Sequence, residues 1–450
     1  MINSAKCGTI IDSLACNAPD FAALNPGYAS SSECLIRLNF ASETFEGISG
    51  MLFEPQETSL LSRFYRKLAA ALFVSTLCSL SHAFAASTEQ DAKVRQVIDE
   101  AVKPVIAQHA LPGMAVGVTI DGKRFFGEYG NASTNPKVAV TRDTLFELGS
   151  ISKTFTATLA VYAEIEGKLS LQDSVSKVMP ALKGGALDKV RVLDLATHTT
   201  GGFPLQLPGD IKNDKQLLAY FKSWKPQFAP GTHRTYANPS VGLLGMVTAK
   251  AMDARFQTLA ERLFSELGLK RTYIEVPAAE MKSYAWGYTR DNKPVRVNSS
   301  LIAAQAYGVK SNAVDMLHYL EANMGMEMGT VPAKVARAID ATHTGYFRAG
   351  EVIQDLIWEQ YPWPVALEKI VAGNSVQMGR ANSSPAIAID PPMAPRGDVI
   401  INKTGSTNGF GAYVAYVPEK KIGIVLLANK FYPNEARVKA AYQVLTRLVE

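Results

Sequence analysis

Apolar and polar positions follow regular patterns at both ends of residues 86–450, and these patterns predict helices and strands. From residue 90 to 110, apolar side chains recur every three or four positions, as on one face of an amphipathic helix. Two apolar runs, at 114–120 and 124–129, then flank the turn sequence Asp121-Gly122-Lys123. An Asp-Gly turn between such runs predicts a β-hairpin directly after the helix.

The C-terminal end shows a similar set of elements. Three β-rich runs precede a final helix at about residues 434–449; the runs cover 399–402, 411–417 and 422–428. The middle of the chain mixes helical stretches with Pro- and Gly-rich loops, and residues 375–398 read as irregular. We therefore predict a mixed α/β fold: one antiparallel sheet formed from both chain ends packs with helices, and a mostly helical lobe is inserted. A ligand site is expected at the seam between them.

A targeting segment precedes this region. Basic residues within 63–67 come before the apolar run 68–80 and the small residues of 83–86. This order is typical of a secretory signal peptide, with cleavage expected after Ala85. Because the apolar run is too short for a spanning helix, we expect export to the periplasm without a membrane anchor.

The signal-peptide region is assigned to residues 51–85, and a signal peptide belongs at a true N-terminus. Residues 1–50 are therefore expected to be an upstream start artefact. The alternative is a disordered extension, since this segment has little periodicity and several small or polar residues. The functional domain is expected to span residues 86–450.

Composition narrows the kind of ligand. The formal charge is +5 and the charged fraction 19%, with no run of Lys or Arg that would form a nucleic-acid-binding arm. All four cysteines, at positions 7, 16, 34 and 78, precede the expected cleavage point, which leaves no thiol chemistry. The six histidines lack the spacing of a metal site, and no cofactor motif is present, so we expect neither metal nor cofactor.

The first chemical motif is S-x-x-K at Ser150 and Lys153, just before the apolar helical stretch 154–165. If Ser150 begins this helix, Lys153 lies one turn further on the same face and can activate the hydroxyl. The same pattern recurs at Ser174 and Lys177, but in a polar stretch that ends soon afterwards. We interpret that second copy as a solvated helix surface.

The second motif is Tyr236-Ala237-Asn238, in a loop before the apolar helix 241–249. A phenol near two lysines has its pKa lowered by their charge and can act as general base and acid. Asn238 can bind an amide carbonyl. The alternative for Tyr236 is packing at a helix entrance, and Tyr432-Pro433-Asn434 shares the spacing.

The third motif is Lys403-Thr404-Gly405-Ser406, which follows the strand 399–402. A strand edge there can align an amide substrate, with Lys403 and Thr404 facing a carboxylate. Gly405 allows close approach of the backbone. The amide of Ser406 is a candidate second oxyanion donor beside that of Ser150.

Together, the three motifs have the order and context of the active-site serine penicillin-recognising enzymes: helix start, loop, strand end. Over residues 90–450 the chain resembles the class C (AmpC-type) β-lactamases. Longer segments carry the resemblance as well: FELGSISKTF (146–155), YAWGY (284–288), AYGVKS (306–311), KTGSTNGFGAYV (403–414) and ANKFYPNEARV (428–438). The resemblance implies the serine β-lactamase/DD-peptidase-like fold.

The resemblance also implies a role for each matching position. Ser150 would be the acylated nucleophile, Lys153 and Tyr236 the proton-transfer groups, and Lys403 their electrostatic partner. The implied substrate contacts are Gln206 and Asn238 on the amide side chain, Tyr307 as a wall, and Thr404, Asn434 and Arg437 near the carboxylate.

Some of these positions have structural alternatives. Arg437 could form a structural salt bridge, Asn434 could cap the last helix, and Tyr307 could pack in the core. Phe431 stands near Asn434 at a position that is often polar in relatives, and residues 375–398 match the family poorly. Both departures bear on the range of substrates, and neither bears on the reaction.

We therefore expect a monomeric, cephalosporinase-like serine β-lactamase that opens the β-lactam amide through an acyl-enzyme on Ser150 and confers antibiotic resistance. A D-alanyl-D-alanine carboxypeptidase or serine esterase of the same fold would share the acylation groups. A non-catalytic penicillin-binding sensor would acylate once and stay modified.

Overall fold

The computed structural model describes residues 89–449 except 299, 327–328 and 380–381. The predicted signal-peptide region 51–85, the cleavage point after Ala85 and residues 1–50 lie outside the described residues. Among the residues that are described, no helix has the length and apolar character needed to cross a membrane.

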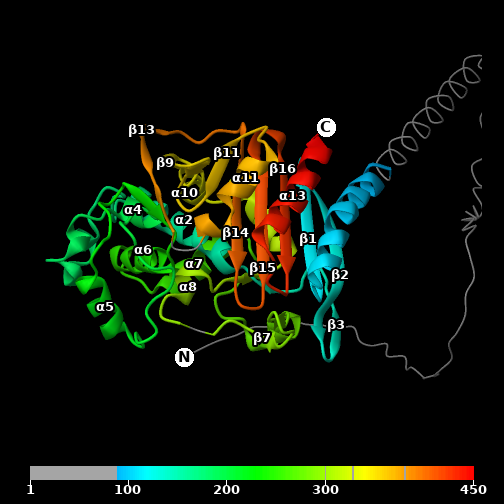
Figure 1. Ribbon diagram of the computed structural model, residues 1–450, viewed down its shortest axis with the longest axis horizontal. Helices are drawn as coiled ribbons and strands as arrows, with labels where there is room; N and C mark the ends of the chain where they lie inside the picture. The colour runs from blue at the N-terminus through cyan, green and yellow to red at the C-terminus, as the bar shows by residue number, and fades with distance from the viewer. Residues whose placement is uncertain (1–88, 299, 327–328, 380–381, 450) are drawn as a thin grey trace, which may run out of the picture. The chain divides into compact units, whose positions relative to one another are not determined.

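Within the described residues, a ten-stranded antiparallel sheet lies at the centre of the fold (Figure 1). In spatial order its strands are β13 (Ile387–Met393), β9 (Gly345–Ala349), β10 (Val352–Gln354), β11 (Glu359–Pro362), β14 (Val399–Ser406), β15 (Gly411–Val417), β16 (Ile422–Ala428), β1 (Gly113–Ile120), β2 (Lys123–Thr134) and β3 (Lys137–Ala139).

The pairing of the chain ends confirms the predicted fold class. Strand β1 pairs with β16, so that Val116 lies opposite Leu426, and the β1–β2 hairpin turns at Asp121 and Gly122 as predicted. Alternate residues of β1 are buried on opposite faces: Met114 belongs to one core cluster and Ala115 to another. Such two-sided burial explains why these strands read as continuous apolar runs.

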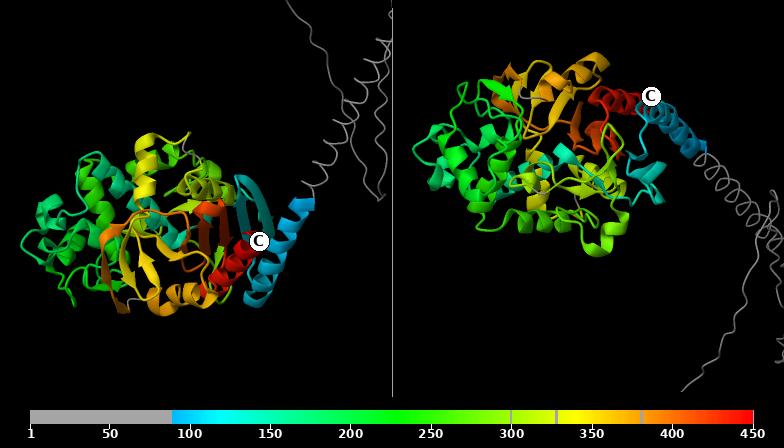
Figure 2. Two further views of the ribbon diagram at one scale, coloured as in Figure 1. Left: turned by 90° about the horizontal axis from the view of Figure 1, so that it is seen from above. Right: turned by 60° about the horizontal axis from the view of Figure 1, so that its bottom comes forward.

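Helices cover both faces of the sheet (Figure 2). The helical residues 89–109 and helix α13 (Asn434–Val449) pack on one face, with Val102 and Val444 in the same buried cluster. Helices α2 (Ser152–Ile165), α7 (Phe256–Glu266), α9 (Ala313–Asn323) and α10 (Ala333–Ala341) pack on the other side.

A second group of helices forms the predicted lobe around its own apolar cluster. Its helices are α3 (Val175–Val178), α4 (Val192–Ala196), α5 (Asp214–Ser223), α6 (Asn238–Ala251) and, beside α6, α8 (Ala303–Ala306). Helix α2 contributes Ala157, Ala160 and Val161 to this cluster while Phe155 and Leu159 face the sheet side. Helix α2, which begins beside Ser150, is therefore packed between the sheet and the helical lobe.

Short strand pairs brace the loops around this seam. They are β4 (Phe146–Glu147) with β8 (Lys310–Ser311), β5 (His233–Thr235) with β12 (Ser383–Pro385), and β6 (Gly287–Tyr288) with β7 (Pro294–Val295).

Two details of the sequence-based prediction were wrong. The sheet also contains β9, β10, β11 and β13, which come from the middle of the chain and not from its ends. Residues 375–398 are not irregular throughout, because they include α12 (Val376–Gly379), β12 and β13. Helix α11 (Leu367–Gly373) precedes them.

Candidate active site

Ser150 lies in a short 3₁₀ turn, η1 (Gly149–Ile151), that runs directly into α2. Its side chain is half-buried, whereas Lys153, in the first turn of α2, is fully buried. Lys153 Nζ donates hydrogen bonds to Ser150 Oγ at 2.9 Å, to Asn238 Oδ1 at 2.6 Å and to the Ala306 carbonyl at 2.7 Å. The amine is thus fixed beside the hydroxyl, as the S-x-x-K motif predicted.

The second S-x-x-K copy has the surface role expected for it. Ser174 caps α3 by accepting a hydrogen bond from the Lys177 amide. The Lys177 side chain is exposed and pairs with Asp173 at 2.5 Å.

Burial changes the acid–base character of Lys153. Desolvation, with the nearby charge of Lys403, lowers the pKa of its amine from 10.5 to about 8, although Tyr236 opposes the shift. A lysine with a pKa in this range can give and take protons near neutral pH.

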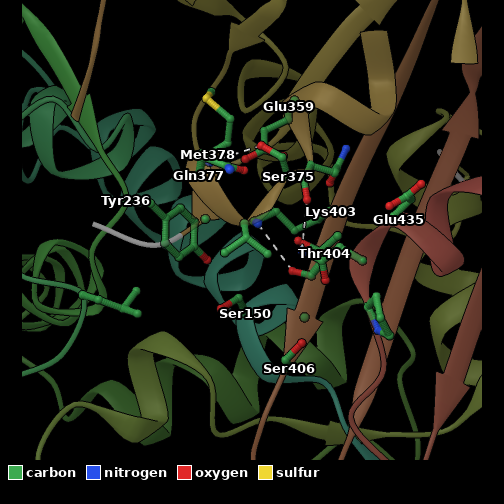
Figure 3. A pocket seen from close by; sticks show the side chains of 18 of the residues that line it. Ser150, Tyr236, Glu359, Ser375, Gln377, Met378, Lys403, Thr404, Ser406 and Glu435 are labelled. Atoms are coloured by element: carbon green, nitrogen blue, oxygen red, sulfur yellow. Dashed lines mark hydrogen bonds between the residues drawn. The ribbon is translucent and has the colours of Figure 1, made fainter. Parts of the chain in front are cut away.

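Tyr236 lies between β5 and α6, with its ring centroid 5.2 Å from Lys153 Nζ and 5.0 Å from Lys403 Nζ. Figure 3 shows its side chain facing the cavity that Ser150 and Lys403 also line. Burial alone would raise the pKa of the phenol, but the two lysines and the Ser150 hydroxyl outweigh burial and lower it from 10.0 to about 8. As predicted, this loop therefore carries a phenol whose pKa is lowered by two nearby lysines.

Lys403 and Thr404 belong to β14, which continues to Ser406 and does not end at Asn402 as predicted. The extension brings β14 against η1. A Cβ atom at Gly149 would lie 2.3 Å from the Ser406 nitrogen, and one at Gly405 would lie 1.9 Å from the Leu148 carbonyl oxygen. The two backbones are in direct contact here, which places the peptide of Ser406 next to the η1 turn that carries Ser150.

Two cavities meet at Ser150. One, of about 520 Å³, extends along β14 toward α11, α12 and the start of α13. The other, of about 790 Å³, extends toward residues 289–298. Both are lined by Ser150, Gln206, Asn238, Arg290, Ser406 and Phe431. The hydroxyl therefore lies where a ligand could reach in both directions.

The predicted amide-binding residues lie together. Asn238 Nδ2 donates to Gln206 Oε1 at 2.9 Å while its own Oδ1 accepts from Lys153. Tyr307 is half-buried, lines the larger cavity and lies 2.5 Å from the Ser300 hydroxyl. Tyr307 therefore lines a cavity and is not packed in the core.

Of the predicted carboxylate contacts, Thr404 and Asn434 line the smaller cavity. Asn434 is the first residue of α13, and its Nδ2 donates to the Asn374 carbonyl at 3.2 Å. Arg437 is fully buried and is not among the residues that line either cavity. Its Nη1 donates to the carbonyls of Gly405 at 2.6 Å and Ala412 at 3.2 Å, so it supports β14 from behind.

Sequence reasoning missed a buried ion pair beside Tyr236. Arg234 on β5 and Glu359 on β11 form a 2.6 Å pair, and the guanidinium lies 5.7 Å from the Tyr236 ring. Arg234 also donates to Gln354 Oε1 at 2.6 Å and to the Met378 carbonyl at 2.9 Å. No short motif carries these residues; the only signal was a charged residue two positions before the tyrosine.

Comparisons with known proteins agree with this geometry. A family model described as Beta-lactamase matches residues 94–448. The chain is 46% identical over 360 residues to a β-lactamase of Pseudomonas fluorescens, covering 79% of this chain and 99% of that protein. A solved class C β-lactamase in complex with cefoxitin is 48% identical, with a TM-score of 0.77 and coverage of 80% of this chain and 99% of the other. A solved D-alanine carboxypeptidase AmpC from Burkholderia cenocepacia is 50% identical, with a TM-score of 0.75 and coverage of 79% and 99%. With the convergence of the three motifs on one hydroxyl, these likenesses show that the chain belongs to the β-lactamase family, in its class C.

Proposed function

We propose that this chain hydrolyses the β-lactam amide by forming and then hydrolysing an ester on Ser150, with cephalosporins as substrates. The observation that carries the proposal is the Lys153 amine, which is hydrogen-bonded to the Ser150 hydroxyl inside a site shared with Tyr236 and Lys403. A serine hydroxyl becomes an effective nucleophile only when a neighbouring base can take its proton.

In the acylation step, Ser150 Oγ attacks the lactam carbonyl carbon, and its proton passes to the Tyr236 phenolate. With a pKa of about 8, a fraction of this phenol is ionised near neutral pH. The amides of Ser150 and Ser406 receive the negative charge that develops on the carbonyl oxygen. The lactam C–N bond then breaks, and the nitrogen takes a proton from the Tyr236 hydroxyl.

Deacylation repeats the same proton movements with water in place of serine. A water oxygen attacks the ester carbon as its proton moves to the Tyr236 phenolate. The ester C–O bond breaks, and Ser150 Oγ recovers its proton from Tyr236. Lys153, hydrogen-bonded to Ser150 Oγ, relays the proton between the hydroxyl and Tyr236 in both steps, and Lys403 acts as a charge that stabilises the phenolate.

The substrate would lie across both cavities. Asn238 and Gln206 would bind the acyl side-chain amide with Tyr307 as a wall, and Thr404 with Asn434 would lie near the carboxylate. The cefoxitin complex of a relative supports a β-lactam as the ligand. The departure at Phe431, which lines both cavities, would affect the preferred antibiotic.

The proposal is tested by steady-state hydrolysis of a chromogenic cephalosporin by purified protein. We expect many turnovers per molecule, and none from Ser150→Ala. A single stoichiometric burst without a steady state would instead identify a penicillin-binding sensor. Efficient release of D-alanine from a peptide ending in D-alanyl-D-alanine, with slow β-lactam turnover, would identify the carboxypeptidase activity that one relative's description names.

We further propose that the chain is exported to the periplasm, where it confers antibiotic resistance as a monomer. The basic, apolar and small-residue order of 63–86 supports export, and every group in the proposed reaction comes from a single chain. Fractionation of expressing cells, N-terminal sequencing of the product and size-exclusion chromatography test these points. A mature product that does not begin at residue 86 would contradict the cleavage point.

A further inference from the structure

His198 contacts Tyr236 and the residue on either side of it. Its carbonyl oxygen accepts a hydrogen bond from the Thr235 amide at 2.8 Å. Its ring lies against the Tyr236 ring, with centroids 4.4 Å apart and planes at 41°. Its Nδ1 accepts a long hydrogen bond, 3.4 Å, from the Ala237 amide.

The backbone of His198 is shaped for this contact. The residue follows α4 and has a φ of +60°, in the left-handed region that non-glycine side chains rarely adopt. The chain after it is also fixed, since the Thr199 amide donates to the Asp194 carbonyl at 2.9 Å. The imidazole is therefore held on a turn that belongs to the lobe, while the tyrosine belongs to the seam.

The charges around Tyr236 come from several elements. The amines of Lys153 on α2 and Lys403 on β14 lie 5.2 and 5.0 Å from the centroid of its ring. The guanidinium of Arg234 on β5 lies 5.7 Å from it, and Glu359 on β11 pairs with Arg234. The Ser150 hydroxyl on η1 also faces the phenol.

His198 adds a ring to this group but no charge. Burial, together with the cations Arg234, Lys153 and Lys403, holds the pKa of the imidazole well below its usual range. With Nδ1 as an acceptor, the proton lies on Nε2, for which no partner is present among the described residues.

We propose that His198 is a positioning residue for Tyr236: its ring, packed against the phenol, fixes the plane of that phenol beside the two lysine amines. The inference rests on the proposed function, in which Tyr236 transfers the proton. His198 is not among the residues that line either cavity, so its effect would pass through Tyr236 and not through substrate contact. The rate of a reaction falls steeply when a catalytic group is displaced from its productive position.

The test compares two substitutions at this position. His198→Asn keeps a side chain that tolerates positive φ but removes the ring. We expect its acylation rate with a chromogenic cephalosporin to fall by about 10- to 100-fold, with the initial binding constant unchanged. The acidic limb of its pH–rate profile should move to higher pH, because a phenol farther from the amines loses their stabilising charge.

His198→Phe keeps the ring and removes the Nδ1 acceptor. The acidic limb of its pH–rate profile should therefore stay at the wild-type pH, and most of the acylation rate should remain. If this variant does not fold, His198→Tyr supplies a ring in its place. His343→Asn is the matched control, because His343 is also buried but packs on Trp358 and Tyr416. It should lower thermal stability without moving the limb.

A second readout does not depend on turnover. Tyrosinate absorbance of each protein, minus that of the same protein carrying Tyr236→Phe, gives the titration of Tyr236 alone. The pKa of Tyr236 obtained in this way should rise in His198→Asn and stay unchanged in His198→Phe. An unmoved titration in His198→Asn, or an equal shift in His198→Phe or His343→Asn, overturns the inference. If the wild type shows no turnover but the Tyr236 titrations behave as expected, the proposed function is wrong and the positioning role of His198 still holds.

Discussion

The amine of Lys403 lies 5.0 Å from the centre of the Tyr236 ring, although the lysine belongs to β14 and the tyrosine to the loop before α6. Lys403 is one of the two cations that lower the pKa of the Tyr236 phenol against the effect of burial. This relationship makes the pH dependence of the reaction a direct test of the site.

Replacing Lys403 by Met should shift the acidic limb of the pH–rate profile upward. A general base acts only above its pKa, and loss of the cation raises the pKa of Tyr236, so activity should begin at higher pH. At this distance the expected shift is about one pH unit. The measurement is kcat/KM for a chromogenic cephalosporin between pH 5 and 10, and the exposed Lys420→Met serves as control. A lower rate with an unmoved limb would mean that Lys403 acts on substrate alone.

Arg437→Met should destabilise the protein. The guanidinium is fully buried, and its loss leaves the carbonyls of Gly405 and Ala412 without this donor. We expect the free energy of unfolding to fall by about 3 kcal/mol in chemical denaturation. Arg396→Met, at an exposed pair with Asp398, should change it by less than about 1 kcal/mol. A raised KM with unchanged stability would instead support contact with a substrate carboxylate.

The Arg234–Glu359 pair should show strong coupling in a double-mutant cycle. Removing one partner leaves a charge in a site where both side chains are at most 5% exposed. Arg234→Met and Glu359→Gln should each cost about 3 to 5 kcal/mol, and the double variant much less than their sum. Urea denaturation of the four proteins gives the coupling energy. Additivity within about 0.5 kcal/mol would show that the pair contributes nothing as a pair.

Gln206→Leu should weaken substrate binding more than chemistry. Gln206 accepts a hydrogen bond from Asn238 Nδ2, whereas the Asn238 contact to Lys153 remains in the variant. Loss of one neutral hydrogen bond corresponds to a KM increase of about fivefold, with kcat nearly unchanged. Michaelis–Menten curves for two cephalosporins measure the split, with the exposed Gln216→Leu alongside. A fall in kcat at constant KM would place Gln206 in the proton-transfer network.

The three candidate motifs could be predicted because each lies in or next to an element with a strong pattern. Ser150 directly precedes the buried helix α2 and Lys153 lies in its first turn, Asn238 begins α6, and Lys403 lies within the apolar strand β14. The last helix was predicted at its observed bounds, since its apolar stripe and first residue are both distinctive.

Other segments of the chain have no sequence pattern from which their structure could be predicted. Strands β10 and β11 have three and four residues, and their buried polar members Gln354 and Glu359 both accept hydrogen bonds from Arg234, which belongs to a distant part of the chain. Strand β13 contains prolines, which argue against a strand unless it lies at a sheet edge, as this one does. His198 was one scattered histidine, and its contact with Tyr236 depends on a turn from another part of the chain.

The direct contact between the peptides of Gly149 and Ser406 has an evolutionary consequence. Since any side chain at Gly149 or Gly405 would force the two backbones apart, new substrate ranges cannot be reached by changes at those glycines. Selection by unfamiliar antibiotics should act instead on exposed residues of the cavity walls, such as Asp291, Val376 and Gln377.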